Sequence, residues 1–303
     1  MLLDIALNVL LGLALGTLGG LFGIGGGLIA IPVLGVLFGL DQQLAQGTAL
    51  VMVVPNVLLA IWRYHQRNRI DWCHALALGS ASFVFAIVGA AVAVSLDPGR
   101  MRLAFVGFLL ALAAYTLLRV FLRPASGDGQ LRHPWPWLGL LGAGAGALGG
   151  LFGVGGAVIA TPILTSVFGT SQVVAQGLSL ALAAPSTGVT LVTYALHHQV
   201  NWLLGLPLAV GGLLSISMGV RLAHALPERL LRFLFSIFLV ASAVLLVLES
   251  WCPQFTRPTR APPTAPPSTT SQGGSFQYIS AARASRARTK CSAALIALVH
   301  TGS

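Results

Sequence analysis

A block of 19 residues occurs twice in this chain, 130 residues apart and without a gap. The first copy, residues 16–34, reads GTLGGLFGIGGGLIAIPVL, and the second, residues 146–164, reads GALGGLFGVGGAVIATPIL, with 13 identical positions. The same offset pairs proline, tyrosine, tryptophan and glycine outside the block, at Pro55 and Pro185, Tyr64 and Tyr194, Trp72 and Trp202, and Gly89 and Gly219. This repeat predicts that the chain folds as two copies of one unit.

The solvent of this fold is predicted to be lipid, because 56% of the 303 residues are hydrophobic and only 8% are charged. Eight apolar runs cover residues 5–40, 44–62, 72–96, 103–122, 135–168, 173–196, 202–226 and 230–248. Each reaches the roughly 20 residues that a helix needs to cross a bilayer. We therefore expect an all-α, multi-pass membrane protein with about eight transmembrane segments, four per repeat. The first apolar run is too long for the hydrophobic region of a signal peptide and follows no Lys or Arg, so we expect it to stay in the mature protein.

The predicted domains are a first repeat over residues 1–123, a linker over 124–134, a second repeat over 135–250 and a tail over 251–303. The tail carries six of the chain's 17 basic residues and no acid. Its Pro, Ser and Thr content predicts disorder, and scattered cations without aromatics favour a membrane surface or solvent over nucleic acid. All seven acids lie at or near segment ends, so no buried carboxylate is expected to relay protons.

Glycines cluster in the middle of the first apolar run of each repeat and are predicted to break its helix. They are Gly23, Gly25, Gly26 and Gly27 in the first copy and Gly153, Gly155 and Gly156 in the second. A fresh helix after each break, with Pro32 in the first turns of the first copy, would present free N–H groups and a partial positive charge. Two such helix starts at mid-membrane predict one binding site for a small anion.

Close helix packing is the alternative role for glycines in a membrane. Two further sets, Gly12, Gly16 and Gly20, and Gly142, Gly146 and Gly150, are spaced by four. That spacing is typical of small residues at helix–helix interfaces, and we assign these six to packing.

Uncharged polar residues in the second segment of each repeat are further candidates for the anion site. They are Gln46, Thr48 and Asn56 in the first copy and Gln176 and Ser186 in the second. Each could instead bond to a neighbouring helix, which is the commoner role of an intramembrane hydroxyl. His65, His197 and His198 lie beside Tyr64 and Tyr194 at segment ends and are interpreted, with these tyrosines, as interfacial anchors.

The sequence shows no pattern of an enzyme or a metalloprotein. Cys73, Cys252 and Cys291 have neither CxxC spacing nor His at metal-ligand intervals. No nucleophile with a base, and no group of metal ligands, falls within the apolar segments. We expect no catalytic residue, cofactor or metal.

Arginine positions favour an inverted arrangement of the repeats. If each repeat crosses the membrane four times, the eleven arginines before residue 250 divide six to five between the two faces. If the glycine-broken first segment enters and returns, they divide nine to two, which the positive-inside rule prefers. We therefore expect inverted repeats that each begin with a hairpin-like broken helix, as in many secondary transporters.

Three pairs of motifs resemble the sulfite exporter TauE/SafE family of bacterial membrane transporters. They are GGLFGIGGGLIAIPVL with GGLFGVGGAVIATPIL, AQGTALVMVVPN with AQGLSLALAAPS, and PGRMRLAFVGFLLALAAY with PERLLRFLFSIFLVAS. The resemblance covers about residues 5–250. It implies a multi-pass protein of the bacterial inner membrane that moves sulfite, sulfoacetate or other organosulfonates. This chain departs from it at Ala157, which aligns with Gly27, and in its tail.

The residues and the resemblance together predict export of a small sulfur-containing anion. With the cell interior negative, one negative charge leaving gains about 2.3 kcal/mol per 100 mV, so a uniporter needs no proton relay. Coupling to protons or sodium through carbonyls and hydroxyls stays open. The alternatives are a passive anion channel and a carrier for another small organic anion. The bilayer is the expected partner, and a homo-oligomer is possible.

Overall fold

The computed structural model describes residues 2–67, 72–122 and 135–251, all of them in helices or in the short turns between helices. The helices up to Val247 belong to one compact unit, and Leu248 begins a second. The predicted linker over 124–134, most of the predicted tail, Cys252 and Cys291 lie outside the described residues. The described residues form ten helices, which are α1 Leu2–Phe22, α2 Gly27–Phe38, α3 Gln42–Arg67, α4 Trp72–Ser95, α5 Pro98–Leu122, α6 Trp135–Phe152, α7 Ala157–Ser166, α8 Gln172–Leu196, α9 Trp202–Ala225 and α10 Glu228–Trp251.

Helix starts in the two halves of the sequence match at the spacing of the repeat. The helices α2, α3, α4 and α5 begin at residues 27, 42, 72 and 98, and α7, α8, α9 and α10 begin at 157, 172, 202 and 228. Each pair is separated by 130 residues. The predicted break is confirmed in both copies, because α1 and α2, and likewise α6 and α7, are separate helices with a short glycine turn between them.

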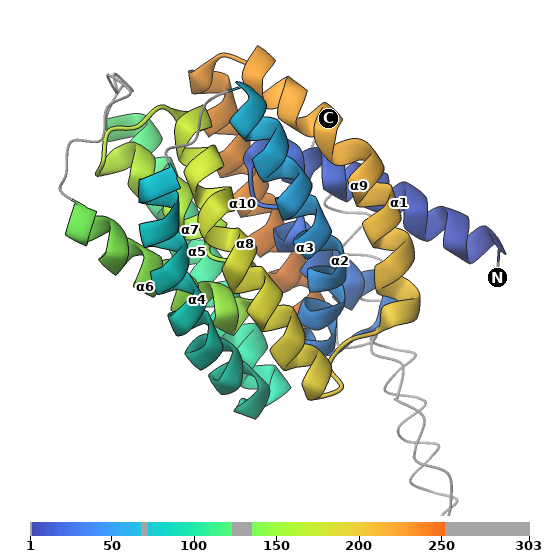
Figure 1. The fold of residues 1–303 in the computed structure, drawn as a ribbon. Helices are drawn as coiled ribbons and strands as arrows, with labels where there is room; N and C mark the ends of the chain where they lie inside the picture. The colour runs from blue at the N-terminus through green and yellow to red at the C-terminus, as the bar shows by residue number, and fades with distance from the viewer. Residues whose placement is uncertain (1, 68–71, 123–134, 252–303) are drawn as a thin grey trace, which may run out of the picture. The chain divides into compact units, whose positions relative to one another are not determined.

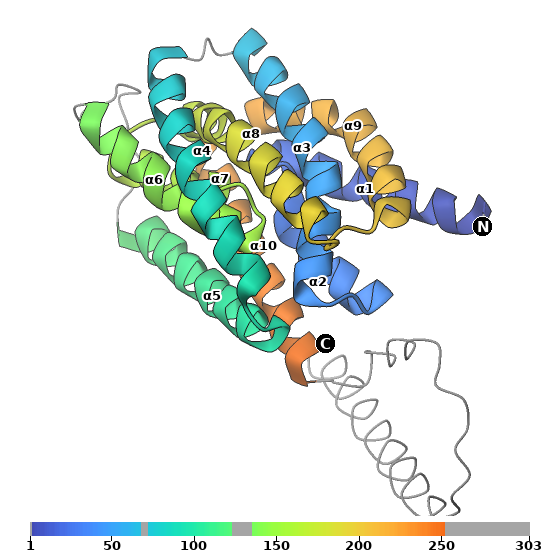
Figure 2. The ribbon, with the colours of Figure 1, turned by 60° about the horizontal axis from the view of Figure 1, so that its bottom comes forward.

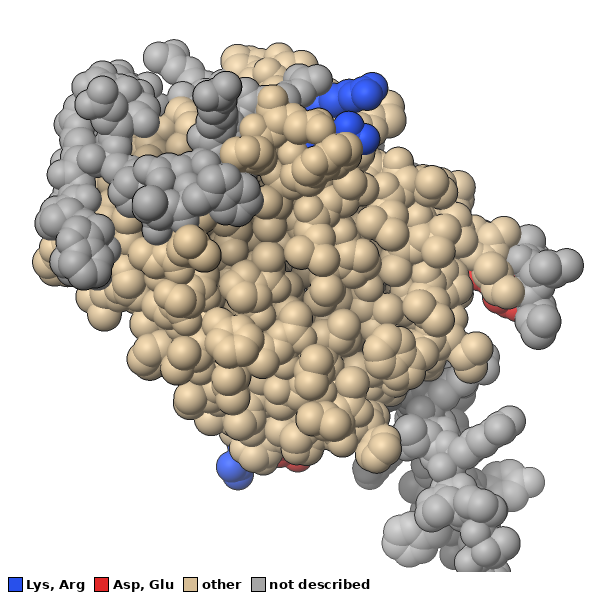
Figure 3. All heavy atoms as spheres, viewed as in Figure 1, with Lys and Arg blue, Asp and Glu red and all other residues tan. Residues whose placement is uncertain are grey.

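Six helices in the described residues are long and apolar enough to cross a membrane, judged by length and composition. Their apolar spans are Asp4–Phe22, Gln42–Gln66, Ala75–Ser95, Pro98–Thr116, Gln172–Leu196 and Trp202–Ala225. The face in Figure 3 is almost free of charged side chains, and the Lys, Arg, Asp and Glu visible on it lie at its margins. The all-helical class predicted from the sequence is confirmed, and so is its membrane character.

The most extensive packing joins the first helix of one half to the fourth helix of the other: α1 lies along α9, and α6 lies along α4 (Figure 1). Both pairs run parallel, because Gly12 contacts Leu208 and Gly16 contacts Gly212. A Cβ added at Gly16 would lie 2.5 Å from the Cα of Gly212, and one at Gly146 would lie 2.6 Å from the Cα of Ser82. The six glycines assigned to packing are therefore confirmed in that role.

The helices α3 and α8 lie side by side between these two pairs and run antiparallel (Figures 1 and 2). Gly47 near the start of α3 faces the backbone of Gln199, just beyond the end of α8. The hydroxyl of Thr48 accepts a hydrogen bond from the Asn201 N–H at 3.0 Å in the same region. These two antiparallel helices supply most of the polar side chains that face the glycine turns.

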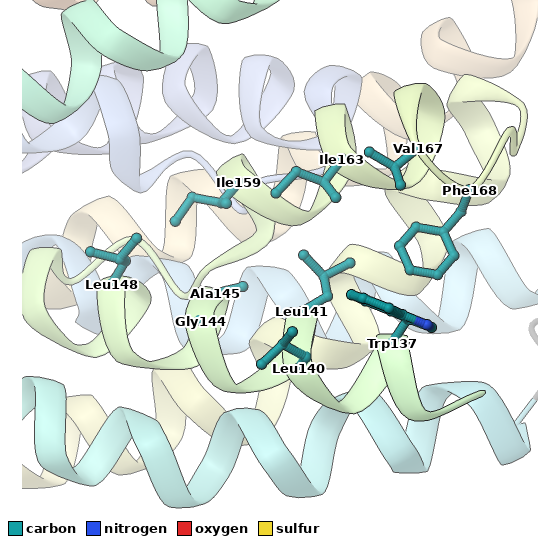
Figure 4. Close-up of a pocket in the computed structure, with 10 residues that line it drawn as sticks. All are labelled: Trp137, Leu140, Leu141, Gly144, Ala145, Leu148, Ile159, Ile163, Val167 and Phe168. Atoms are coloured by element: carbon teal, nitrogen blue, oxygen red, sulfur yellow. The ribbon is translucent and has the colours of Figure 1, made fainter. Parts of the chain in front are cut away.

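Each broken helix folds back on itself. A Cβ added at Gly26 would lie 2.7 Å from the carbonyl oxygen of Leu15, so the start of α2 lies beside the middle of α1. In the second copy Gly156 is packed against Ala145 in the same way. Figure 4 shows α7 running back alongside α6, from Ile159 near Leu148 to Phe168 near Trp137. The two glycine turns are the tips of two helical hairpins.

Candidate functional site at the glycine loops

The first glycine loop, residues 23–26, and the second glycine loop, residues 153–156, have nearly the same backbone. Left-handed φ angles occur at Gly23 (68°), Gly25 (70°) and Gly26 (92°) in the first loop. The second loop has 68°, 73° and 74° at Gly153, Gly155 and Gly156. A side chain at such an angle costs roughly 1–2 kcal/mol per residue, so glycine is required by conformation here.

Hydrogen bonds close each loop onto the end of the preceding helix. The Ile24 N–H donates to the Gly19 carbonyl at 3.1 Å, and the Val154 N–H donates to the Gly149 carbonyl at 3.2 Å. A Cβ at Gly19 would lie 2.6 Å from the carbonyl carbon of Gly25. The GG pair at Gly19 and Gly20 therefore has two roles: Gly19 admits the returning loop, whereas Gly20 contacts α9.

The two loops are buried beside each other, and each one contacts a glutamine from the opposite half. A Cβ at Gly23 would lie 2.7 Å from the Cβ of Gln176, and one at Gly153 would lie 3.1 Å from the Cβ of Gln46. A Cβ at Gly27 would lie 3.8 Å from the carbonyl oxygen of Gly153, so the loops themselves adjoin. The structure thus brings the predicted glycines of each repeat into contact with the predicted glutamine of the other repeat.

Two buried tyrosines hold these glutamines. The Tyr64 hydroxyl donates toward the Gln176 Oε1 at 2.8 Å and the Gly20 carbonyl at 3.1 Å. The Tyr194 hydroxyl donates toward the Gln46 Oε1 at 2.9 Å and the Leu151 carbonyl at 3.3 Å. Both tyrosines have no exposed surface. Their interpretation as interfacial anchors is wrong, because each phenol is shared between a hairpin and a helix of the other half.

The glutamine amides differ between the halves. The Gln176 Nε2 donates to the Leu21 carbonyl at 3.3 Å, which ties α8 to the end of α1. The Gln46 Nε2 is fully buried and has no hydrogen-bond partner among the residues that the structure describes. A buried donor without a partner carries a desolvation cost of roughly 1–3 kcal/mol, so an acceptor at this position would be stabilised.

Asn56 and Ser186 hold the loop carbonyls. The Asn56 Nδ2 donates to the Gly25 carbonyl at 3.3 Å, and the Ser186 hydroxyl lies 3.0 Å from the Gly155 carbonyl. Ser186 also reaches two carbonyls of its own helix. Thr48 is placed differently, since its hydroxyl donates to the Leu44 carbonyl and accepts from Asn201. It contributes to the contact between α3 and the α8–α9 turn.

The helices that start at the loops have no side-chain caps from the described residues, unlike α5, α8 and α9. Asp97 accepts the Gly99 N–H at the start of α5, and Ser171 and Asn201 accept backbone N–H groups at the starts of α8 and α9. Gly26 and Gly156 are the N-cap residues of α2 and α7, and neither helix has a side-chain cap. Their first-turn amides and the positive end of the helix dipole are therefore directed at the loop region.

The chemistry of this region is uncharged and donor-rich. No acidic residue lies in the first turn of α2 or α7. Among the described residues, no group of three His, Cys, Asp or Glu side chains could hold a metal ion. A Cβ at Gly25 would lie 2.7 Å from the Val57 side chain, and Gly155 is similarly close to Thr187. A bound ion would therefore require the loops to separate from α3 and α8.

Sequence reasoning missed the two tyrosines as part of the site, although the repeat held the signal. Each one follows its own repeat's glutamine by 18 residues, at Gln46 and Tyr64 and at Gln176 and Tyr194. His224 was also missed. Its ring lies 5.0 Å from the ring of Tyr64, and its Nε2 is buried without a partner. The position that aligns with His224 is Val94, so this contact belongs to one half alone.

The sequence profile of the family described as sulfite exporter TauE/SafE matches residues 8–246. A protein of Xylella fastidiosa named a probable membrane transporter is 29% identical over 251 residues, covering 80% of this chain and 93% of the relative. The probable membrane transporter YunE of Bacillus subtilis is 24% identical, with 80% and 96% covered. A probable membrane transporter of Methanocaldococcus jannaschii is 32% identical, with 54% and 62% covered. The matched stretch includes both glycine loops.

Proposed function

The chain belongs to the sulfite exporter TauE/SafE family, and from this premise we propose that it exports a small sulfur-containing anion, sulfite or an organosulfonate. It is a membrane transporter, and the proposal concerns its substrate, direction and mechanism. The observation that carries the proposal is the meeting of two uncapped helix starts, α2 and α7, in a buried region without carboxylates. Oriented amides and a partial positive charge suit an oxyanion.

The proposed binding residues are Gly23, Gly25, Gly26, Gly27, Gly153, Gly155 and Gly156, with Gln46, Gln176, Asn56 and Ser186 around them. The first-turn amides of α2 and α7 donate to the anion, and the unpartnered Gln46 Nε2 adds a side-chain donor. Gln176, Asn56 and Ser186 position the loops through the hydrogen bonds described above. Thr48 was predicted among the binding residues, and its contacts support a positioning role instead.

The depth of the loops follows from helix length. The returning helices α2 and α7 have 12 and 10 residues, or about 18 and 15 Å at 1.5 Å per residue. That is about half of a hydrocarbon core of roughly 30 Å. If each returning helix ends at one membrane surface, its glycine loop lies near the midplane, which supports a substrate site at the depth where secondary transporters bind their substrates.

We infer that the two repeats have inverted topology. In this arrangement α1 with α2, and α6 with α7, enter and return as hairpins although α1 is long enough to cross, so three crossings remain per repeat, an odd number. The antiparallel direction of the equivalent helices α3 and α8 supports it. This arrangement also gives the nine-to-two arginine division, with the arginine-rich face in the cytoplasm of a bacterial inner membrane. Accessibility labelling at Gln66 and His198 tests it. Labels that react from opposite faces support inversion, and labels that react from the same face exclude it.

Transport by alternating access would separate the loops from α3 and α8 on one side at a time. The shared hydroxyls of Tyr64 and Tyr194 suit this role, because each has a glutamine acceptor and a hairpin carbonyl within reach. An inside-negative potential drives export of each negative charge by about 2.3 kcal/mol per 100 mV. The proposed mechanism is therefore uniport.

Flux from proteoliposomes tests the substrate and the mechanism together. Vesicles are loaded with sulfite, sulfate, thiosulfate, taurine, sulfoacetate or simple carboxylates, and a potassium gradient with valinomycin sets the potential. We expect saturable efflux of sulfite or sulfonates that accelerates when the interior is negative. Linear flux would identify a passive channel, and preference for carboxylates would identify a carrier for another organic anion. Gly25→Leu and Gly155→Leu serve as the inactive controls. Each is used only if its size-exclusion profile matches that of the wild type, which shows that the variant still folds.

A further inference from the structure

The second hairpin encloses an apolar crevice that the proposed anion site does not use. A cavity of about 430 Å³ lies between α6 and α7. One wall consists of Leu140, Leu141 and Leu148 from α6, and the other of Ile159 and Ile163 from α7 and Val167 just after it (Figure 4). Trp137 and Phe168 face each other at the end far from the glycine loop. Such walls offer an anion no compensation for lost hydration.

This crevice is open sideways, toward the surroundings of the protein. Leu140 is 65% exposed and Trp137 is 56% exposed, although both line the cavity. A Cβ added at Gly144, in the middle of α6, would meet no atom within 4 Å. No side chain of the described residues therefore fills the space beside Gly144, between the two arms of the hairpin. In a membrane, the molecules that reach such an opening are lipids.

The crevice has the length of one lipid leaflet. Its α7 wall belongs to a helix of 10 residues, or about 15 Å, and half of the hydrocarbon core is also about 15 Å. Trp137 lies near the start of α6, the end that the proposed topology assigns to the membrane surface, where its indole N–H can donate to a lipid head group. The crevice thus combines an apolar slot of acyl-chain length with a polar donor at its outer end.

We propose that one acyl chain of a bilayer phospholipid occupies the crevice between α6 and α7. The acyl chain lies along Leu141 and Ile163, with its methyl end toward the second glycine loop, and the lipid head group lies beside Trp137. In this position it holds the arms of the hairpin apart. A lipid of this kind is a structural ligand of the transporter, separate from the transported anion.

Two glycines of α6 provide a matched test. Gly144 lines the crevice, whereas Gly139 lies outside it, and an added Cβ meets nothing within 4 Å at either position. Gly144→Leu should fill the crevice, and Gly139→Leu adds the same atoms elsewhere on α6. Native mass spectrometry after detergent washing counts the phospholipids retained per chain. We expect the wild type and Gly139→Leu to keep one lipid that Gly144→Leu loses.

A second measurement keeps the test independent of how Gly144→Leu folds. Phospholipids brominated along the acyl chain are exchanged in, excess lipid is removed, and tryptophan emission of the wild type is compared with that of Trp137→Phe. We expect the emission component lost in Trp137→Phe to remain quenched after washing. Equal lipid counts in Gly144→Leu and Gly139→Leu would overturn the proposal, as would loss of quenching on washing. A dimer that retains no phospholipid would assign the crevice to a second copy of the chain.

Discussion

The two glycine loops share a backbone but differ in how firmly side chains hold them. Three side-chain bonds secure the first hairpin: from Tyr64 to Gly20, from Gln176 to Leu21 and from Asn56 to Gly25. The second hairpin has two such bonds near its loop, from Tyr194 to Leu151 and from Ser186 to Gly155, and a third between Tyr115 and Ser166 at the far end of α7. The glutamine that faces the second loop, Gln46, keeps its amide nitrogen unpartnered.

This comparison separates the features that the two repeats share from those in which they differ. The left-handed glycines and the close contacts of α1 with α9 and of α6 with α4 are steric requirements, so they recur in both copies. Among the polar residues that face the loops, the glutamine and the tyrosine also recur, whereas Asn56 of the first copy is replaced by Ser186 in the second. We infer that the first loop is the more firmly held side of the anion site and that the second loop, which faces the unpartnered Gln46 amide, is the side that moves.

The largest effect is expected from substitutions of the glycines with left-handed φ, which both loops share. Gly25→Ala and Gly155→Ala each place a Cβ at a left-handed φ, which costs about 1–2 kcal/mol, and against the Val57 or Thr187 side chain. We expect each variant to lose at least about tenfold in flux, since 1.4 kcal/mol corresponds to a factor of ten. Gly188→Ala, whose Cβ meets nothing within 4 Å, is the control. Normal flux in either variant would remove that loop from the transport path.

The next effect tests whether the steric scaffold is equivalent in the two halves. Gly16→Ala forces α1 from α9, and Gly146→Ala forces α6 from α4, because the added Cβ would lie within 2.6 Å of a neighbouring helix backbone in both cases. We expect each to lower the free energy of unfolding by about 1–3 kcal/mol. Thermal unfolding in detergent measures both. A variant that unfolds like the wild type would show that one half tolerates looser packing.

The glutamines should separate stability from binding. Gln176→Leu removes the bonds to Tyr64 and Leu21, whereas Gln46→Leu removes only the bond to Tyr194. At about 0.5–1.5 kcal/mol per bond, Gln176→Leu should be the less stable variant. Gln46→Leu should instead raise the KM for export about tenfold, because it loses a donor to a charged ligand. Equal effects of the two changes on KM would refute the role of Gln46 as a donor to the anion.

The smallest effect concerns the residues that hold the loop carbonyls. Asn56→Ala removes the side-chain hydrogen bond to the Gly25 carbonyl. Ser186→Ala removes the bond to the Gly155 carbonyl, but the Ser186 hydroxyl is shared with carbonyls of its own helix, so this bond is the weaker of the two. Intramembrane hydrogen bonds average about 0.6 kcal/mol, so we expect a loss of that size for Asn56→Ala and a smaller one for Ser186→Ala. The two unfolding temperatures, measured side by side, give the order. The reverse order would mean that the second loop is the more firmly held.

Several parts of this structure could be predicted from the sequence because they depend on local requirements. Consecutive glycines break a helix in lipid wherever they occur, and small residues spaced by four form a face that admits another helix. Both predictions are confirmed at Gly25 and Gly16. The tyrosines were misinterpreted because their position at segment ends indicates an interface, while their burial depends on helices more than 100 residues away.

By itself, the sequence determined the helical class, the membrane setting, the duplication and the two breaks, because apolar length, repeat spacing and glycine clustering are properties of neighbouring residues. Only the tertiary structure decided that α1 pairs with α9 rather than with its own repeat, and that Tyr64 meets Gln176 while Tyr194 meets Gln46. The reason is physical. In lipid, every apolar helix face satisfies the solvent equally well, so partner choice depends on shape and on buried hydrogen bonds that form only when the helices meet.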